Sequence, residues 1–366
     1  MNIGIFLGHP AQYHYFRNTA KLLRDNGHKV YFAVKEKDIL VELLDSAGEN
    51  YVRIRAGRGN GYLAYVISVL TMEYNMVRFI KEYHIDLLIG STLTFATRVF
   101  TRTKIITNGE DDAQIVPLYS FIALPFAHHS LSPFSCSMWH WEKQTIHYPG
   151  FLKLAYLHPN RFTPDANVPK KYGIDPDKPY FLIRFAKLNA HHDNGVNGIS
   201  TAIAEQIVRL LAPKGHIYIT SERALEPQFE QYRLHINPLD IHHVMAFATL
   251  YIGDSQSMAV EAAMLGVPSL RFNDFVGKKK IGVMEELEHA YGLTYGISSH
   301  EPETLYAKIN DLLAMPRLRE DFQARRRKML ADKIDVTAFL TYFIENYPQS
   351  AKAAKAPDNN FWGRFR

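Results

Sequence analysis

The chain has very little cysteine and no long apolar run. Cys136 is the single cysteine among 366 residues, which excludes an intramolecular disulfide and favours a reducing compartment. No stretch of about 18 apolar residues occurs, so the sequence predicts no membrane-spanning helix. Met1 and Asn2 lead directly into an apolar segment. We therefore expect no signal peptide and a cytoplasmic protein, with peripheral contact at the inner face of a membrane left open.

Charge of either sign is also not in large excess. Forty-two Lys and Arg residues against 37 Asp and Glu residues leave a net charge of +5. This excess is too weak to argue for nucleic acid as a partner, but it suits an anionic ligand or an anionic membrane surface. The contents of 47% hydrophobic and 22% charged residues are typical of a globular protein, and the length is sufficient for two domains.

The N-terminal half repeats a strand–helix rhythm, which predicts an α/β fold with a parallel, doubly wound sheet. Ligands of such sheets lie beyond the carboxyl ends of the strands. The loops at 8–14, 58–61, 90–92 and 108–112 should therefore lie along one crevice. Strands are predicted at 3–7, 28–34, 51–54, 87–89 and 104–107, and helices at 13–25, 38–47, 62–83 and 91–100.

Three later segments interrupt this rhythm. Residues 113–129 are apolar and fit a buried helix better than an apolar acceptor or membrane-facing surface, because core helices are commoner. Prolines crowd residues 149–179, which predicts a linker with one short helix. From residue 349 the chain is polar and rich in Ala and Lys, so we expect a disordered tail. Its basic and aromatic end could contact anionic lipid.

A second strand–helix series occupies the C-terminal half. Within it, residues 251–272 predict a strand, a turn, a helix and a strand. Ser255 is placed to cap the helix, and Gly266 to end it. A helix N-terminus with free N–H groups and the hydroxyls of Ser255 and Ser257 suits a phosphate group. An ordinary crossover with Ser caps and a solvated Glu261 fits the pattern equally well. Strands are predicted at 180–185, 216–220, 249–252 and 269–272, and helices at 198–211, 239–247, 257–265, 303–313, 318–332 and 336–347.

Two doubly wound domains with a late phosphate-type motif predict a GT-B-like fold, in which two Rossmann-like domains face a central cleft. The chain also resembles domain-of-unknown-function family 354 (DUF354), a bacterial and archaeal group. This family is distantly similar to GT-B glycosyltransferases and to non-hydrolysing UDP-N-acetylglucosamine 2-epimerases. The resemblance covers nearly the whole chain and rests on Gly8-His9-Pro10, His14-Tyr15-Phe16, Glu110, Tyr148-Pro149-Gly150, Leu157-His158-Pro159, Arg161-Phe162, Arg184-Phe185, Ile252-Gly253-Asp254-Ser255-Gln256 and Arg271-Phe272-Asn273-Asp274-Phe275.

This resemblance implies a donor site at the late motif. Ser255, Gln256, Ser257 and Met258 would contact the donor diphosphate, and Glu261 would contact the ribose. Because Gln256-Ser257 replaces the Gly-Gly of the epimerases, the epimerase interpretation is weaker. The predicted division is an acceptor-side domain at 1–150, a linker at 151–178, a nucleotide-sugar-binding domain at 179–347 and a tail at 348–366.

Glycosyl transfer requires stabilisation of the leaving diphosphate and deprotonation of the acceptor hydroxyl. For the first task we expect Arg184 and Lys187, which follow the first strand of the second domain, although Lys187 could equally be a solvated charge. Ser221 and Glu222 complete the donor set. For the second task the candidates are His14, Glu110 and Asp111. The acceptor side also includes His9, Arg58 and Asn60.

We expect neither a metal nor another cofactor. The adjacent histidine pairs at 128–129, 191–192 and 242–243 point in different directions on a helix or strand, so one pair seldom chelates one ion. The predicted function is a metal-independent glycosyltransferase of polysaccharide or glycolipid assembly. It would use a UDP- or GDP-linked sugar and a saccharide or lipid-linked acceptor. The alternatives are a nucleotide-sugar 2-epimerase and a non-catalytic partner that binds a sugar nucleotide.

Overall fold

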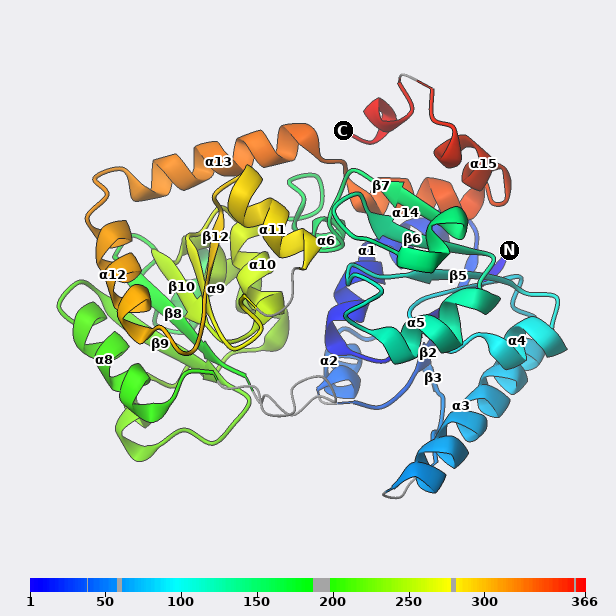
Figure 1. Ribbon diagram of the computed structural model, residues 1–366, viewed down its shortest axis with the longest axis horizontal. Helices are drawn as coiled ribbons and strands as arrows, with labels where there is room; N and C mark the ends of the chain where they lie inside the picture. The colour runs from blue at the N-terminus through cyan, green and yellow to red at the C-terminus, as the bar shows by residue number, and fades with distance from the viewer. Residues whose placement is uncertain (38, 58–60, 187–197, 278–280, 359) are drawn as a thin grey trace. The chain divides into compact units, whose positions relative to one another are not determined.

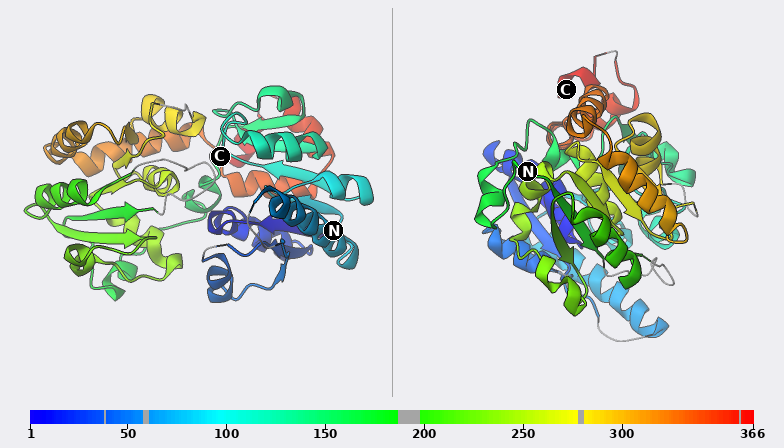
Figure 2. Two further views of the ribbon diagram at one scale, coloured as in Figure 1. Left: turned by 60° about the horizontal axis from the view of Figure 1, so that its bottom comes forward. Right: turned by 90° about the vertical axis from the view of Figure 1, so that its left-hand side faces the viewer.

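A computed structural model describes residues 1–37, 39–57, 61–186, 198–277, 281–358 and 360–366 (Figure 1). The chain forms two compact units. Unit 1 contains Met1–Arg161 and Lys333–Arg366, and unit 2 contains Phe162–Asp332. Each unit is built around a parallel β-sheet with helices packed on it (Figure 2). The predicted α/β fold with two Rossmann-like domains is therefore confirmed.

Seven parallel strands form the sheet of unit 1, in the order β3-β2-β1-β4-β5-β6-β7. The chain runs outward from β1 to β3, returns to β4 beside β1, and then continues to β7. The direction in which the chain adds strands to the sheet therefore reverses between β1 and β4. The strands are β1 (Asn2–Leu7), β2 (Lys29–Val34), β3 (Tyr51–Arg53), β4 (Leu87–Ile89), β5 (Lys104–Asn108), β6 (His129–Pro133) and β7 (Thr145–Tyr148).

Right-handed crossovers place α1 and α2 on one face of this sheet and α3, α4 and α5 on the other. The side chains agree: the Phe32 ring meets Tyr13 of α1, whereas a Cβ on Gly4 would lie 3.2 Å from Phe79 of α3. Among the helices of the described residues, none is both long and apolar enough to cross a membrane. The helices of unit 1 are α1 (Pro10–Asp25), α2 (Leu40–Ser46), α3 (Tyr62–Glu82), α4 (Phe95–Phe100), α5 (Pro117–Ala123), α6 (Leu154–Leu157), α14 (Val336–Glu345) and α15 (Gln349–Lys355), with short turns η1 (Leu124–Phe126), η2 (Trp139–Gln144) and η6 (Trp362–Phe365).

Unit 2 has a five-stranded parallel sheet in the order β12-β11-β10-β8-β9. Its strands are β8 (Tyr180–Phe185), β9 (His216–Ser221), β10 (Leu250–Gly253), β11 (Ser269–Phe272) and β12 (Thr294–Ile297). Its helices are α7 (Asn167–Lys171), α8 (Thr201–Leu211), α9 (Ile241–Phe247), α10 (Gln256–Met264), α11 (Gly282–Glu285), α12 (Pro302–Leu313) and α13 (Leu318–Asp332), with shorter turns η3 (Pro227–Tyr232), η4 (Pro238–Asp240) and η5 (Glu286–Ala290).

The prediction of one buried helix over 113–129 is wrong. Helix α5 begins at Pro117, as expected for a residue that lacks an N–H, and ends within two turns. Its side chains Leu118 and Phe121 are exposed to solvent. Strand β6 follows from His129, and the sequence did not predict it.

The predicted linker at 151–178 is also wrong over its first part. Phe151, Leu154 and Tyr156 are fully buried, and α6 lies in this segment. The boundary between the units falls after Arg161. The first part of this proline-rich region is therefore packed within unit 1, and only the part after Arg161 belongs to unit 2.

The C-terminal segment belongs to unit 1, which corrects the predicted domain at 179–347 and the predicted disordered tail at 348–366. The hydroxyl of Thr337 on α14 donates to the Ala155 carbonyl oxygen at 2.6 Å. Phe361 is 1% exposed, and its ring packs against Tyr342 of α14. Phe361 and Phe365 are both buried, one helical turn apart, because they complete the apolar face of α14. They are not available to a lipid surface.

Replacement of Phe361 with Ala should lower the free energy of unfolding of unit 1 by about 3 kcal/mol or more, because it empties a buried aromatic site. All three tryptophans lie in unit 1, so their fluorescence during urea unfolding reports on this unit. The matched control is Arg364→Ala, which removes an exposed ion pair with Asp358 and should cost below about 1 kcal/mol. Equal stability of the Phe361 variant and the parent would mean that the tail does not pack on α14.

Candidate functional site

The segment predicted as strand, turn, helix and strand is confirmed as β10, a turn, α10 and β11. Gly253 ends β10, and a Cβ there would lie 2.5 Å from the hydroxyl oxygen of Tyr251, so only glycine fits. Ser255 is the N-cap of α10, and its hydroxyl accepts from the Met258 N–H at 3.5 Å. Gly266 ends the helix with a φ of +70°. The first turn of α10 is partly exposed, so its free N–H groups can reach a ligand.

Asp254 connects several segments at the edge of the unit 2 sheet where the carboxyl ends of β8 and β10 lie. Its side chain accepts from the Ala186 N–H at 2.6 Å and from the Ile199 N–H at 3.4 Å. The residue is 2% exposed, and burial raises the pKa of its carboxyl to about 6, although the two N–H donors oppose this change. Asn273 donates to the Asp254 carbonyl oxygen at 3.0 Å. Asp254 therefore joins the end of β8, the approach to α8 and the turn before α10.

Neither Asp254 nor Asn273 was predicted as a site residue. Both lie in motifs that carry the resemblance to the family, and those motifs were the signal that could have found them. In the structure these two motifs end adjacent strands, β10 and β11, and are hydrogen-bonded to each other. Their spacing in the sequence could not show that contact.

Two arginine side chains, Arg271 and Arg184, lie at this edge of unit 2, with the carboxylates of Glu222, Glu285 and Glu288 near them. Arg271 is buried beside the first turn of α10, where its Nη1 lies 3.4 Å from the side-chain oxygen of Gln256. Burial lowers the pKa of its guanidinium, and the carboxylates of Glu288 and Glu285 oppose this change. Within the described residues, the buried Nε of Arg271 has no hydrogen-bond partner. Because the guanidinium and the helix N-terminus are both positive, an anion is the natural complement of this place.

The other predicted donor residues gather at the same edge. Arg184 lies beside Gly253 in the strand register, and its guanidinium forms an ion pair with Glu222 at the end of β9. The Ser221 hydroxyl donates to the Arg223 carbonyl oxygen at 2.7 Å and shapes the same turn. Lys187 lies outside the described residues.

Glu261 faces the interior of unit 2. Its Oε1 lies 3.3 Å from Nε2 of His242, which belongs to α9, and both side chains are buried. The neighbouring His243 accepts instead from the Asp165 N–H at 3.0 Å. The two adjacent histidines therefore point to different partners, as the sequence predicted for such a pair.

In unit 1, the loop after β1 holds two of the predicted residues. His9 is the N-cap of α1, and its Nδ1 accepts from the Ala11 N–H at 3.2 Å. His14 lies in the second turn and is 7% exposed. Its ring lies between those of Tyr13 and Tyr156, with centroids 5.9 Å and 5.2 Å away. His9 therefore caps α1, and His14 packs among aromatic rings.

Glu110, in the loop after β5, is buried and holds other chain segments. One carboxylate oxygen accepts from the Leu152 N–H at 2.9 Å, and the other is paired with the ammonium group of Lys153. The Cys136 thiol donates to its carbonyl oxygen at 3.1 Å. Asp111, the next residue, is exposed. Glu110 therefore fixes the segment at Leu152 and Lys153 to the loop after β5, whereas Asp111 is exposed to solvent.

The buried residues 151–157 connect the two loops that supply the predicted bases. The Lys153 ammonium group, which pairs with Glu110, lies 5.4 Å from the ring centroid of Tyr15, and Tyr156 contacts His14. Strand β4 separates β1 from β5, so the loops are not direct neighbours in the sheet. The segment predicted as a linker is what joins them.

Two other predicted residues, Arg58 and Asn60, lie outside the described residues. Within the part of the chain that the structure describes, no group of three or more His, Cys, Asp or Glu side chains is placed to hold a metal ion.

No protein-family model matches the sequence, and no curated protein matches it either. The resemblance to family 354 therefore stays a prediction. The fold, however, is shared with solved structures. A spinosyn forosaminyltransferase, SpnP, is 14% identical with a TM-score of 0.64, and the match covers 94% of this chain and 100% of that one.

Two further solved structures with this fold contain UDP-GlcNAc or UDP. The UDP-GlcNAc 2-epimerase from Neisseria meningitidis, bound to UDP-GlcNAc, is 13% identical with a TM-score of 0.62, covering 91% of this chain and 99% of that one. The S. aureus MnaA structure with UDP is 12% identical with a TM-score of 0.65, covering 95% and 97%. The GT-B-like fold class follows from these matches and the two parallel sheets.

Asp254 should give unit 2 a distinctive pH dependence. Because its pKa is raised from 3.8 to about 6 in the folded state, its contribution to stability is complete below about pH 4 and is lost as the pH rises to about 6. Over this pH range the free energy of unfolding of unit 2 should fall by about 3 kcal/mol. Hydrogen exchange of the β8 and β10 amides reports on unit 2 directly. The Asp254→Asn variant should lack this loss, and an identical pH profile for variant and parent would contradict the assignment.

Proposed function

We propose that the protein is a metal-independent glycosyltransferase that moves a sugar from a nucleotide-sugar donor to an acceptor in surface polysaccharide or glycolipid assembly. The observation that carries the proposal is the first turn of α10, whose capped and partly exposed N-terminus lies beside the buried guanidinium of Arg271. The structural neighbours include glycosyltransferases, and two neighbours were solved with UDP-GlcNAc or UDP. The two complexes support a nucleotide-sugar donor, which we propose to be UDP- or GDP-linked.

The donor diphosphate would bind at the α10 N-terminus. The first N–H groups of a helix have no carbonyl partner within the helix. In α10 the Met258 N–H donates to the Ser255 hydroxyl, and the N–H groups of Gln256 and Ser257 remain for the diphosphate. As the glycosidic bond to the donor breaks, negative charge grows on the diphosphate. The helix N-terminus and Arg271 would stabilise that charge where a metal ion does so in other enzymes. Arg184 would supply a further positive charge.

The acceptor would be activated in unit 1. An acceptor hydroxyl oxygen attacks the anomeric carbon of the donor sugar, the bond to the diphosphate breaks, and the hydroxyl proton passes to a base. We assign this base to His14, because a histidine imidazole is the side chain that most often accepts a proton in general-base catalysis. Glu110 is less suited, since both of its carboxylate oxygens already serve Leu152 and Lys153.

A nucleotide-sugar 2-epimerase is the second candidate, because epimerases are among the solved structures that share this fold. An epimerase needs no acceptor and returns an isomeric nucleotide sugar. A non-catalytic partner would bind the nucleotide sugar and return it unchanged. Incubation with UDP- and GDP-linked sugars separates the three functions by their products.

Replacement of Ser257 with Ala should weaken UDP or GDP binding by about 1–3 kcal/mol, because one hydrogen bond to a charged group is lost. Isothermal calorimetry measures this. Ser255→Ala should weaken binding similarly and also lower the stability of unit 2 by about 1 kcal/mol, because Ser255 caps α10. If neither variant changes the affinity for any nucleotide that the parent binds, the diphosphate does not lie at α10.

Replacement of His14 with Gln should lower turnover by roughly a hundredfold or more while nucleotide affinity stays nearly unchanged. Turnover is measured as acceptor-dependent release of the nucleoside diphosphate. Glu110→Gln should instead lower the stability of unit 1 by about 3–5 kcal/mol, because it removes the carboxylate charge that pairs with the buried Lys153 ammonium group. A folded Glu110→Gln enzyme without turnover, beside a fully active His14 variant, would transfer the role of base to Glu110.

A further inference from the structure

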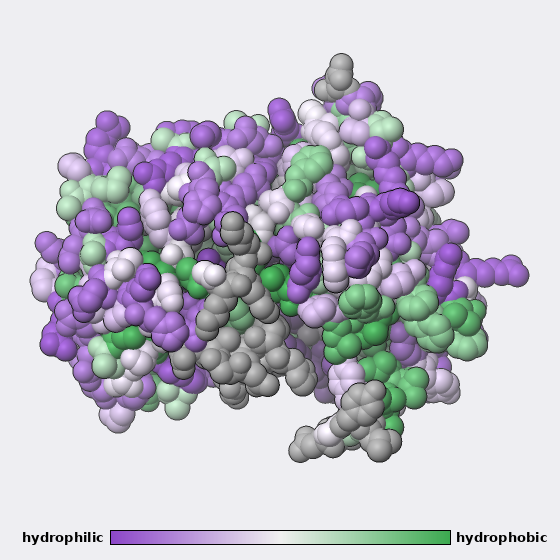
Figure 3. Space-filling model, viewed as in Figure 1, coloured by the Kyte–Doolittle hydropathy of each residue, from purple (hydrophilic) through white to green (hydrophobic). Residues whose placement is uncertain are grey.

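The exposed large apolar side chains of the described residues all belong to unit 1, and most of them lie on α3, α4 and α5. These helices cover one face of the sheet. Figure 3 shows apolar side chains gathered over this part of unit 1. We call it the α3–α5 surface. Contiguous exposed apolar surface on a folded protein marks a place of interaction.

Helix α3 contributes a regular stripe to this surface. Ile67, Leu70 and Tyr74 are spaced by three and four residues, so they share one face of the helix, and Leu70 is 63% exposed. The opposite face carries Met72 and Met76, which belong to the apolar core against the sheet. The helix is therefore apolar on both sides, although the core needs only one of them.

Helices α4 and α5 extend the stripe into a continuous surface. Phe100 on α4 is 62% exposed, and Phe121 on α5 is 54% exposed. The two helices are tied together, since the Thr94 hydroxyl donates to the Ala123 carbonyl oxygen at 2.6 Å. Three helices that are separated in the sequence thus present apolar side chains side by side.

Acidic residues are few on the three helices of this surface. Helix α3 contains two acidic residues. Glu73 is buried and accepts from the Ala96 N–H of α4 at 3.0 Å, and Glu82 is exposed at the C-terminal end of the helix. Residues 87–109 and 113–141 contain no Asp or Glu at all. The same helices carry exposed basic side chains, including Arg78 and Arg98. The surface is therefore apolar with a positive border.

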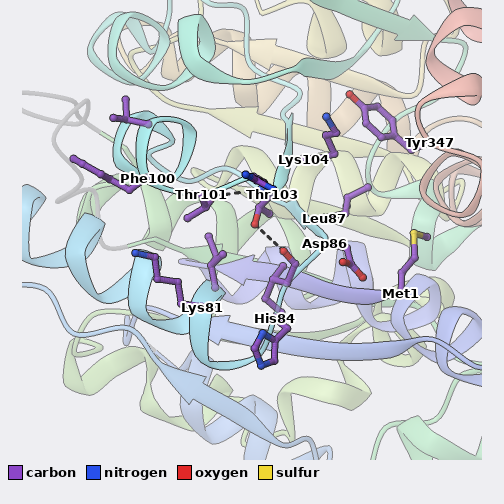
Figure 4. A pocket seen from close by; sticks show the side chains of 14 residues that line it. Met1, Lys81, His84, Asp86, Leu87, Phe100, Thr101, Thr103, Lys104 and Tyr347 are labelled. Carbon is purple, nitrogen blue, oxygen red and sulfur yellow. Dashed lines mark hydrogen bonds between the residues drawn. The ribbon is translucent and has the colours of Figure 1, made fainter.

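A groove of about 810 Å³ adjoins the surface where α3 and α4 end, at the amino-terminal edge of the sheet. Phe100 belongs to both the surface and the groove. Lys81, Arg102 and Lys104 line the groove, and Figure 4 shows the two lysines at its sides. Asp86, whose Oδ2 accepts from the Asn2 N–H at 2.8 Å, is the one carboxylate among the described residues that line the groove, against these three cationic side chains. The groove is suited to a phosphate group.

We propose that the α3–α5 surface docks on an anionic membrane, with its apolar side chains at the headgroup–acyl boundary and the basic groove against lipid phosphates. An apolar face with a basic border is the pattern of an interfacial membrane contact. A second copy of the chain fits less well, because a two-fold contact through this surface would bring the two positive borders together. The proposal does not depend on the glycosyltransferase activity.

Sedimentation of the full chain with vesicles tests the proposal. The protein should bind vesicles that contain phosphatidylglycerol and remain free with phosphatidylcholine alone. Leu70→Gln with Phe100→Gln should weaken binding by at least about tenfold, because two apolar anchors are lost. Lys81→Gln, Arg102→Gln and Lys104→Gln together should weaken it by on the order of a hundredfold. The control is Ile39→Gln, an exposed residue just before α2 on the opposite face, which should change nothing.

The outcomes separate the alternatives. Loss of vesicle binding in both sets of variants, with an unchanged circular dichroism spectrum, supports the membrane. No binding to either kind of vesicle overturns the proposal, as does binding that neither set of variants changes. If the parent is a dimer by sedimentation velocity and Leu70→Gln with Phe100→Gln makes it monomeric, the surface is an interface between copies and the proposal is wrong.

Discussion

The handedness of the β-α-β crossover is the constraint on which this molecule depends. Crossovers between parallel strands are right-handed as a rule. The outward run from β1 to β3 therefore places its helices on one face of the unit 1 sheet, and the return to β4 places the later helices on the other. All strands are parallel, so the loops after them meet at one edge. The positions of the candidate sites and of the α3–α5 surface both follow from parallel strands joined by right-handed crossovers.

Buried carboxylates stabilise the loop edges of the two units in different ways. Among the described residues, backbone N–H groups of Ala186 and Ile199 donate to the Asp254 side chain, and burial raises the pKa of its carboxyl. Glu110 is satisfied by one N–H group and by the Lys153 ammonium group. In each case a single side chain joins segments that are far apart in the sequence. Such contacts hold the loops in place and prepare the edge for a ligand.

The sequence predicted the parts of the fold that local rules determine. Helix α10 was found from its Ser255 cap and Gly266 end, and the early strands from their apolar runs. The segment 151–157 and the C-terminal segment were misjudged, because prolines or small polar residues suggested linkers and disorder while the contacts that bury them come from residues far away. Asp254 was missed as a site residue for the same reason, since its partners Ala186 and Ile199 lie far before it in the chain.

Function imposes different demands on the two units. Unit 2 has no exposed large apolar side chain among its described residues, and its loop edge collects arginines around a helix N-terminus. Unit 1 keeps its histidine candidate buried among tyrosines and exposes an apolar, positively bordered surface formed by three of its helices. Under the proposed function, a small water-soluble donor needs only the first kind of site. A surface of the second kind has no use in binding such a donor, and it is explained if the acceptor is presented at a membrane.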